Sequence, residues 1–398
     1  MNLNYIEKWL PEATVNYKDG RPAVGFGLII TVFFRNGHLP EVRQKMMESV
    51  DRFYGEFKPY MKKQMAHRWG GITEKNYAKY RQEIIDSTPE EIFSWHLTSA
   101  TEDYLAPDYE IRMIGLRIFH NESNLSVIKL TFPFSFLKQS DGYKRYQEWL
   151  LWLCNEFEVE SGYGGLSFVL PQEFYNMFPY EYALAQRFSG VMVDSIGILE
   201  GGHAVDGIKG ACWYTILGNP WLEKLGGEDR LKRYIKDTPD ITLLPYNNGM
   251  IIKAGELPPS LGEINTEELP PLLVKVNQII KPIRLKKDRS LHFYSMEENL
   301  QFDEESTAKW YARFDEASAL LSEPDFNTPE QKRITAQSGE ISPHTGLWGT
   351  LVNGSIDYAQ VKQGQPLPEF EDKHGKFHQT VWSLLERDDK GSVYIDVV

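Results

Sequence analysis

The pattern that comes closest to a catalytic site is a pair of histidines near the C-terminus. His374 and His378 have the spacing of two ligands on one face of a helix, and Glu371 and Asp372 precede them. Such a cluster could hold zinc in a hydrolase, which needs three oriented ligands and an open position. However, Gly375 interrupts the pair, and the glutamate of a His-Glu-x-x-His motif is absent. A zinc-dependent hydrolase therefore stays an alternative, beside a polar loop with two solvated imidazoles.

Three other patterns lack the residues that their chemistry requires. Residues 25–27 (Gly-Phe-Gly) lack the third glycine of a dinucleotide-binding turn, and residues 162–165 (Gly-Tyr-Gly-Gly) lack the Lys-Ser/Thr of a phosphate loop. Cys154 and Cys212 lie in neither a Cys-x-x-Cys pair nor an electropositive segment, so no nucleophilic thiol is indicated. We expect no catalytic residue, no metal and no cofactor.

The composition narrows the class of protein further. The chain has 398 residues with 13% aromatic residues, which is enough apolar surface for a large core and excludes general disorder. Its net charge of -13 repels phosphate backbones and anionic lipid, so we expect basic protein partners, no direct nucleic acid and no membrane. Two cysteines among apolar neighbours, no signal peptide and no apolar run of about 18 residues predict a soluble, cytoplasmic protein.

Apolar periodicity predicts strands and helices that alternate irregularly. The predicted strands are residues 24–34, 109–119, 125–136, 166–170, 208–217, 241–244 and 250–253. The predicted helices are residues 40–58, 141–157, 180–188, 220–225, 228–235 and 271–280. Two of the strand pairs are hairpins, one of them closed by Asn248-Gly249. The fold class is therefore α+β: a mixed, largely antiparallel sheet flanked by helices and followed by a small β-rich C-terminal module.

Composition shifts late in the chain predict the domain boundaries. Residues 256–271 contain four prolines and a basic run follows at residues 281–289, so the first domain is placed at residues 1–290. Residues 291–330 are rich in acids, and an apolar stripe of Trp310, Phe314, Ala317 and Leu321 predicts an acidic helical connector with its acids facing outward. Residues 331–398 form the predicted C-terminal module.

A family resemblance appears in an ordered series of motifs that begins at residues 208–227, IKGACWYTILGNPWLEKLGG. It continues through residues 248–255 (NGMIIKAG), 261–265 (LGEIN), Pro270-Pro271 and residues 281–284 (KPIR), and the glycines at 162–165 and the strand at 27–34 fit as well. The series is similar to the type VI secretion immunity proteins for VRR-Nuc effectors. The chain departs from the commoner family pattern at Ala211-Cys212 and at Glu263. The matched residues, such as Trp213, Leu217 and Leu225, are of structural types that carry a fold.

The C-terminal module resembles a second pattern, found in other bacterial toxin-immunity proteins. It comprises residues 338–348 (SGEISPHTGLW), residues 363–368 (QGQPLP) and Trp382. From the residues alone, this is a small β-rich module in which Gly and Pro set turns while Trp348 and Trp382 pack.

The resemblance implies a non-enzymatic immunity protein that binds a VRR-Nuc DNase effector and occludes its active site and DNA-binding cleft. Because that cleft must be basic, acidic residues of expected exposure are the predicted contacts. They are Asp303, Glu304, Glu305, Asp315 and Glu316 of the connector, Glu102, Asp103, Tyr104 and Asp108 of one loop, and Glu200 and Asp206 near His203. An immunity protein against a non-nuclease toxin is a second hypothesis, because such families can be retargeted without changing their core.

Overall fold

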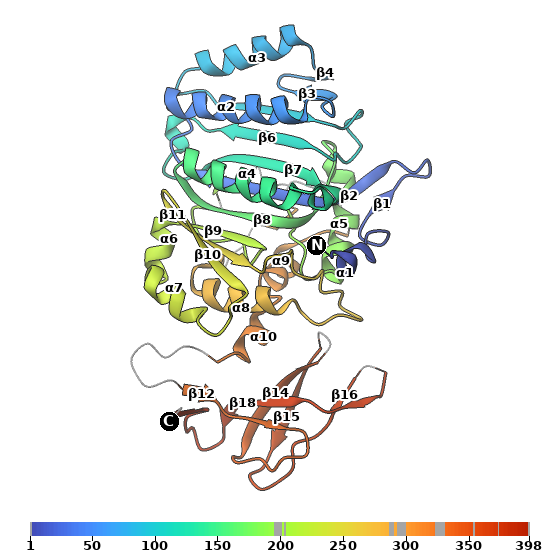
Figure 1. Ribbon diagram of the computed structural model, residues 1–398, viewed down its shortest axis with the longest axis vertical. Helices are drawn as coiled ribbons and strands as arrows, with labels where there is room; N and C mark the ends of the chain where they lie inside the picture. The colour runs from blue at the N-terminus through green and yellow to red at the C-terminus, as the bar shows by residue number, and fades with distance from the viewer. Residues whose placement is uncertain are drawn as a thin grey trace.

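The computed structural model describes residues 2–194, 201–202, 204–285, 290–292, 300–322, 331–352, 355–372 and 374–396. The strands of its main sheet are β1 (Val15–Asn16), β2 (Pro22–Phe34), β3 (Lys63–Met65), β4 (Trp69–Gly71), β5 (Phe93–Thr98), β6 (Glu110–Gly115), β7 (Ser126–Pro133), β8 (Val159–Val169), β9 (Tyr214–Gly218), β10 (Ile241–Tyr246) and β11 (Gly249–Ala254). Within the described ranges this sheet has 11 strands in the order β10-β11-β9-β8-β2-β7-β6-β5-β3-β4, with β1 beside β2. Its ladders are antiparallel, so the predicted fold class is confirmed (Figure 1).

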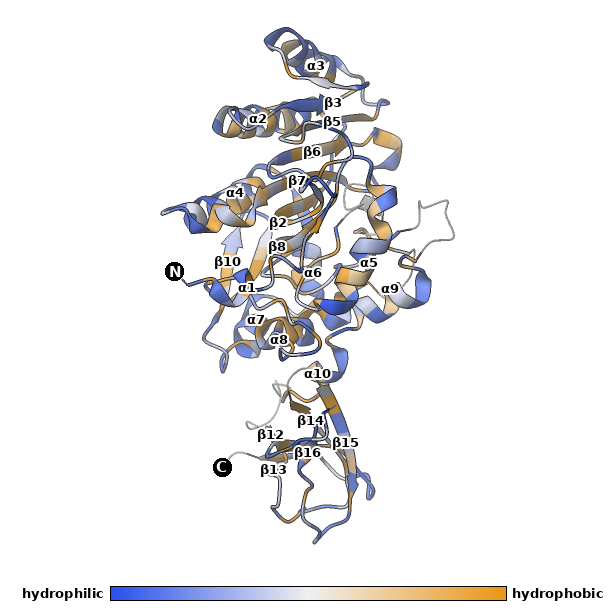
Figure 2. Cartoon of the chain, turned by 90° about the vertical axis from the view of Figure 1, so that its right-hand side faces the viewer, coloured by the Kyte–Doolittle hydropathy of each residue, from blue (hydrophilic) through white to orange (hydrophobic). Residues whose placement is uncertain are grey.

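Helices cover both faces of the sheet. The helices are α1 (Asn4–Glu7), α2 (Pro40–Phe57), α3 (Glu74–Asp86), α4 (Gly142–Glu156), α5 (Phe178–Arg187), α6 (Asn219–Lys224), α7 (Glu228–Tyr234), α8 (Pro271–Ile280), α9 (Glu304–Tyr311) and α10 (Asp315–Ala319). Figure 2 shows α2 and α4 on one face, and α5 and α9 on the other. Covering both faces buries both sides of the central strands, which explains why β2 is an almost continuous apolar run.

The central strand β8 is longer than expected. The strand was predicted only at residues 166–170, after the glycines at 162–165, but β8 begins at Val159 and pairs with β2 along its length. The prediction was wrong because these glycines permit a close approach. A Cβ on Gly162 would lie 2.4 Å from the carbonyl oxygen of Thr31, and one on Gly164 would lie 2.8 Å from the Tyr146 hydroxyl. Glycine therefore lets strand and helix pack closely here, without ending the strand.

The strand predicted at residues 208–217 is shorter than expected. Strand β9 begins only at Tyr214, although residues 208–213 are buried. The backbone N–H of Cys212 donates to the hydroxyl of Thr215 at 3.1 Å, which turns the chain immediately before the strand. The apolar character of this segment therefore reflects burial and not sheet pairing.

The C-terminal residues form smaller sheets of their own. The strands are β12 (Gln331–Arg333), β13 (Thr335–Gln337), β14 (Gly346–Val352), β15 (Ser355–Val361), β16 (Phe370–Glu371), β17 (Phe377–His378), β18 (Val381–Arg387) and β19 (Tyr394–Asp396). Strands β13, β18, β14 and β15 form one sheet, around a cluster that includes the fully buried Trp348 and Trp382. Leu351 and Ile356 pack against the core cluster of α8 and α10, so the C-terminal module contacts the main body. The division of the chain into three domains stays a prediction.

Candidate functional site

The predicted acidic helix is two short helices, α9 and α10, separated by Ala312–Phe314. Asp303 is the N-cap of α9: its carboxylate accepts the backbone N–H of Ser306 at 2.7 Å. That capping contact with Ser306 lowers the pKa of Asp303. Glu304 and Glu305 are exposed in the first turn, where negative charge also suits the helix dipole, and Glu305 pairs with Lys309 at 2.7 Å. These three acids face outward as predicted.

Asp315 does not face outward, and that part of the prediction was wrong. Its carboxylate accepts from Nη2 of Arg284 at 2.9 Å and from Nδ2 of Asn277 at 3.0 Å, and Lys281 lies 3.6 Å away. Burial alone would raise the pKa of Asp315, but hydrogen bonds from Arg284 and Asn277 outweigh burial and lower it. A basic side chain after α8 thus holds this acid in place. Glu316 is exposed and accepts a hydrogen bond from the Tyr358 hydroxyl of the C-terminal module at 3.2 Å.

These placements predict unequal effects on stability for two acids, one on α10 and one on α9. Asp315→Ala should lower the free energy of unfolding by about 1.5–3 kcal/mol, because it removes charge-assisted hydrogen bonds and leaves Arg284 without its carboxylate. Glu304→Ala should change it by less than about 0.5 kcal/mol, as is usual for an exposed site. Urea denaturation of both variants tests the contrast. Equal destabilisation would contradict the assigned roles.

The other predicted contact residues lie in two places. Glu102, Asp103, Tyr104 and Asp108 lie in the loop between β5 and β6, where Glu102, Tyr104 and Asp108 are exposed. Asp206 is also exposed and lines a hollow with Trp221, Lys224 and Arg284. Glu200 and His203 lie outside the described residues.

Helix α5 lies between the β5–β6 loop and α9. The backbone N–H of Glu173, shortly before α5, donates to the carbonyl of Asp103 in the loop at 2.9 Å. Farther along, the ring of Tyr182 on α5 packs edge-on against Phe302, next to the cap of α9, with 4.9 Å between centroids. The structure thus links the predicted loop to the predicted helix through α5, which lies with α9 on the side of the sheet opposite α2 and α4 (Figure 2).

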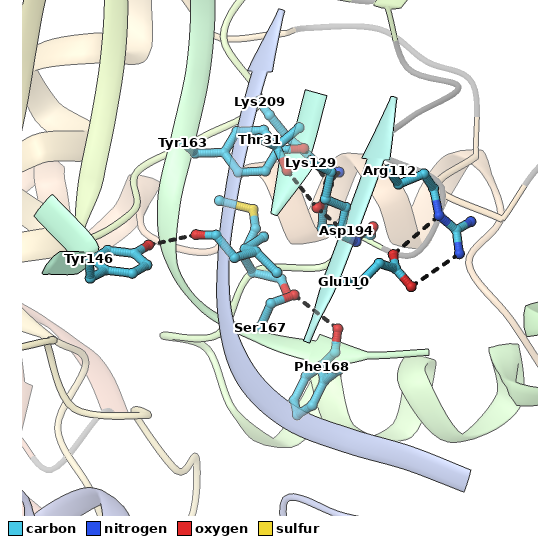
Figure 3. A network of polar contacts seen from close by, with 12 residues as sticks. Thr31, Glu110, Arg112, Lys129, Tyr146, Tyr163, Ser167, Phe168, Asp194 and Lys209 are labelled. Carbon is cyan, nitrogen blue, oxygen red and sulfur yellow. Dashed lines mark hydrogen bonds and ion pairs between the residues drawn. The ribbon is translucent and has the colours of Figure 1, made fainter. Parts of the chain in front are cut away.

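A buried polar cluster, not predicted from the sequence, lies under this same side. Thr31, Lys129 and Tyr163 occupy paired positions on β2, β7 and β8, so their side chains share one face of the sheet. All three contact Asp194, which is fully buried: Thr31 Oγ1 lies 2.9 Å from Oδ2, Lys129 Nζ lies 3.0 Å from Oδ2, and the Tyr163 hydroxyl donates to Oδ1. Lys209 Nζ is 3.9 Å from Oδ1, and Figure 3 shows how these groups surround the carboxylate.

The charge balance of this cluster favours the ionised acid. Burial alone would raise the pKa of Asp194, but the attraction of Lys129 and Lys209 and the Tyr163 hydrogen bond outweigh it, so the pKa is lowered. A signal was present in the sequence: Lys129 and Asp194 are single charges inside apolar runs, and such residues are rarely buried unless paired. The sequence could not say which two belong together.

A second buried acid, Glu110, lies on strand β6 beside this cluster. Glu110 accepts from Arg112 on one side and contacts His96 Nε2 at 2.7 Å on the other, as Figure 3 shows for Arg112. Burial opposes ionisation of Glu110, but Arg112 and His96 outweigh it and hold its pKa well below the usual range. Because cations neutralise both Asp194 and Glu110, the two clusters stabilise the sheet that carries the β5–β6 loop.

The histidine pair does not form a metal-ligand set. His378 Nε2 lies 2.8 Å from Asp372, whose other oxygen accepts the backbone N–H groups of His374 and Lys376. The bond from His378 and these backbone groups lower the pKa of Asp372 to about 2. In the part of the chain that the structure describes, no three His, Cys, Asp or Glu side chains gather as metal ligands. Likewise, none of its helices combines the length and the apolar character needed to cross a membrane.

Comparison with known proteins identifies the family of the chain over most of the main sheet and its helices. Residues 45–314 match TsiV, the family described as type VI immunity for VRR-NUC. The chain belongs to this family. The TsiV match includes β5, β6, α5 and α9, together with Lys129, Tyr163 and Asp194 of the buried cluster, whereas Thr31 precedes it. The C-terminal module lies outside it, so its resemblance to other toxin-immunity proteins stays a prediction.

A solved structure resembles the TsiV chain in fold. It is a T6SS protein of Pseudomonas aeruginosa, PA0821, which is 21% identical, with a TM-score of 0.66 over 76% of this chain and 87% of that one. No curated protein matches the chain in sequence. Family membership indicates a role in type VI immunity and favours a non-enzymatic one. The motif residues have the structural roles expected of them, since Trp213, Leu217 and Leu225 are all buried.

Proposed function

We propose that this protein binds the VRR-NUC nuclease domain of a type VI effector and neutralises it by covering the active site and the DNA-binding cleft. Membership in the TsiV family over residues 45–314 carries the proposal. A DNase must present a basic surface to phosphates, and this chain, with a net charge of -13, offers exposed carboxylates that complement such a surface. The acids on α9 and in the β5–β6 loop are the proposed contacts.

The proposal also fits the way in which the carboxylates divide between buried and exposed positions. Asp194 and Glu110 are neutralised internally, whereas Glu102 and Glu304 are exposed on the face around α5. Exposed acids can attract a basic partner over several ångströms and speed its approach. The two cysteines are buried free thiols, as suits the reducing compartment where DNA would be attacked.

Inhibition of the nuclease by purified protein tests the function. A VRR-NUC effector encoded next to this chain is incubated with plasmid DNA and increasing amounts of the protein, while calorimetry follows complex formation. We expect cleavage to stop at a stoichiometric ratio, with tight binding that weakens as salt increases. Undiminished cleavage without binding would show that the toxin assignment is wrong and would favour a non-nuclease toxin.

Charge reversal locates the contact. The double variant Glu304→Lys, Glu305→Lys should slow association by about tenfold or more at low salt, because it places positive charge against a basic cleft. The matched control reverses Glu48 and Glu148, which are exposed on α2 and α4 on the other side of the sheet, so the net charge changes equally. Asp315 is left unchanged because it has a structural partner. Equal effects of the two double variants would rule out α9 as the contact.

A further inference from the structure

Four tyrosines from separate segments gather at the end of the sheet where β2 begins and β5 ends. They are Tyr17 after β1, Tyr104 in the β5–β6 loop, Tyr175 in the short helix η3 (Phe174–Met177), and Tyr180 on α5. We call them the tyrosine surface. Tyr104, Tyr175 and Tyr180 expose 38%, 44% and 47% of their area, so part of each ring is open to a partner.

Direct contacts join Tyr17 to Tyr104, and Tyr175 to the start of α5. The rings of Tyr17 and Tyr104 meet edge-on with 5.7 Å between centroids, and the Tyr17 hydroxyl donates to the carbonyl of Tyr104 at 3.1 Å. Desolvation raises the pKa of Tyr17, and the phenols of Tyr104 and Tyr180 raise it further. Tyr175 packs edge-on against Phe178, the first residue of α5, at 5.7 Å.

The backbone under the tyrosine surface is held in place before any partner arrives. The N–H of Ala106 donates to the carbonyl of Pro22 at 3.0 Å, and the N–H of Glu173 donates to that of Asp103 at 2.9 Å. These bonds join the β5–β6 loop to the start of β2 and to the segment before α5. A surface that is already ordered loses little conformational entropy on binding, and tyrosine itself has few rotamers to lose.

The charges around the tyrosine surface favour a basic partner. The neighbouring carboxylates are Glu102, Asp103, Asp108 and Glu173. Among the cations, Arg21 lies 5.5 Å from the centre of the Tyr104 ring, but it forms an ion pair with Asp19 at 2.7 Å. Lys18 is the other exposed cation of this turn. Tyrosine rings surrounded by carboxylates complement a partner surface that carries Lys or Arg side chains beside apolar hollows. The faces of the tyrosine rings also attract these cations.

We infer that the tyrosine surface is the anchor that the basic face of the effector nuclease domain docks onto, and that it sets how long the complex lasts. The inference rests on the proposed function and adds the residues that control dissociation. Buried tyrosines at the centre of an interface carry most of the binding energy, whereas charges at its rim act chiefly on the rate of encounter. Tyr104 and Tyr180 therefore govern dissociation, and Glu102 and Glu173 govern association.

Binding kinetics with the purified effector nuclease domain test this division. We expect Tyr104→Ala and Tyr180→Ala each to speed dissociation by about tenfold or more while association changes by less than about threefold. We expect Glu102→Gln with Glu173→Gln to slow association and to flatten its salt dependence while dissociation stays close to the wild-type rate. Tyr104→Phe keeps the ring and should dissociate like the wild type.

The controls separate this inference from the proposed function. Phe119→Ala removes an exposed aromatic ring, 73% exposed, from the segment after β6 at the opposite end of the strands, and it should leave both rates unchanged. Thermal unfolding of each variant confirms that its fold is intact. If the wild type binds tightly but both tyrosine variants dissociate at its rate, the inference is overturned and the function stands. If the wild type does not bind the nuclease domain, both are overturned.

Discussion

Asp194→Ala is expected to lower the free energy of unfolding by about 3–5 kcal/mol, because it removes a buried carboxylate that lies against two buried ammonium groups. Lys129 and Lys209 expose 9% and 4% of their side chains, so water cannot replace the carboxylate. Thr31 and Tyr163 lose an acceptor as well. Urea denaturation measures the loss. Glu228→Ala is the matched control, since its pair with Lys232 on α7 is exposed and should be worth less than about 1 kcal/mol.

The same cluster should make stability depend on acid. The folded-state pKa of Asp194 lies below its ordinary value, which is about 3.9 in an unfolded chain. Its contribution is therefore fully present above about pH 4 and is lost as the pH falls toward the folded-state pKa. Wild-type stability should decline through this window more steeply than that of Asp194→Ala. Parallel acid limbs for the two proteins would show that the carboxylate is not ionised in the fold.

Trp213→Ala is expected to cost a similar amount, about 3–5 kcal/mol, through the cavity it leaves. Trp213 is 2% exposed and stacks on Tyr146 with 5.5 Å between ring centroids and 9° between planes. Its indole N–H donates to the carbonyl of Gly255 at 3.1 Å, which ties the start of β9 to the end of β11. Thermal and urea unfolding measure the effect.

A conservative change separates packing from hydrogen bonding at this position. Trp213→Phe keeps an aromatic ring against Tyr146 but cannot donate to Gly255, so it should cost roughly half as much as the alanine variant or less. The variant that still folds should also retain inhibition of the effector, because Trp213 is buried and contacts no proposed interface residue. Loss of inhibition by a stable Trp213→Phe variant would contradict a purely structural role for this motif.

Local patterns predicted the elements well where one face of an element meets the core. Helix α2 begins at Pro40, and its Met46, Val50, Phe53 and Phe57 are buried at the expected three- and four-residue spacing. The Asn-Gly hairpin was also confirmed, with Tyr246 paired to Gly249 across the turn of β10 and β11. Such features depend on residues within one or two turns of each other, so the sequence alone contains their cause.

The exposure of the predicted acidic residues followed only in part from the sequence, for a related reason. Exposure of Glu304 and Glu305 follows from their place opposite the apolar stripe of α9, which the sequence reveals. Pairing of Asp315 with Arg284 depends on how α10 packs against the chain that follows α8, and no local pattern contains that. The tyrosine surface was missed except for Tyr104, because its members are spread over residues 17 to 180 and look like ordinary amphipathic residues one at a time.

The sequence by itself determined the fold class, the family and an acidic chain suited to a basic partner. Each of these follows from composition, from local periodicity, or from motifs that keep their order along the chain. Only the tertiary structure decided which charged side chains pair inside the fold and which stay exposed to a partner. Asp194 meets Lys129 across 65 residues and Thr31 across 163. Such contacts arise when segments distant in the sequence take neighbouring places at the sheet. Burying an unpaired carboxylate costs much free energy, so a buried carboxylate needs a cation beside it, whereas an exposed one does not.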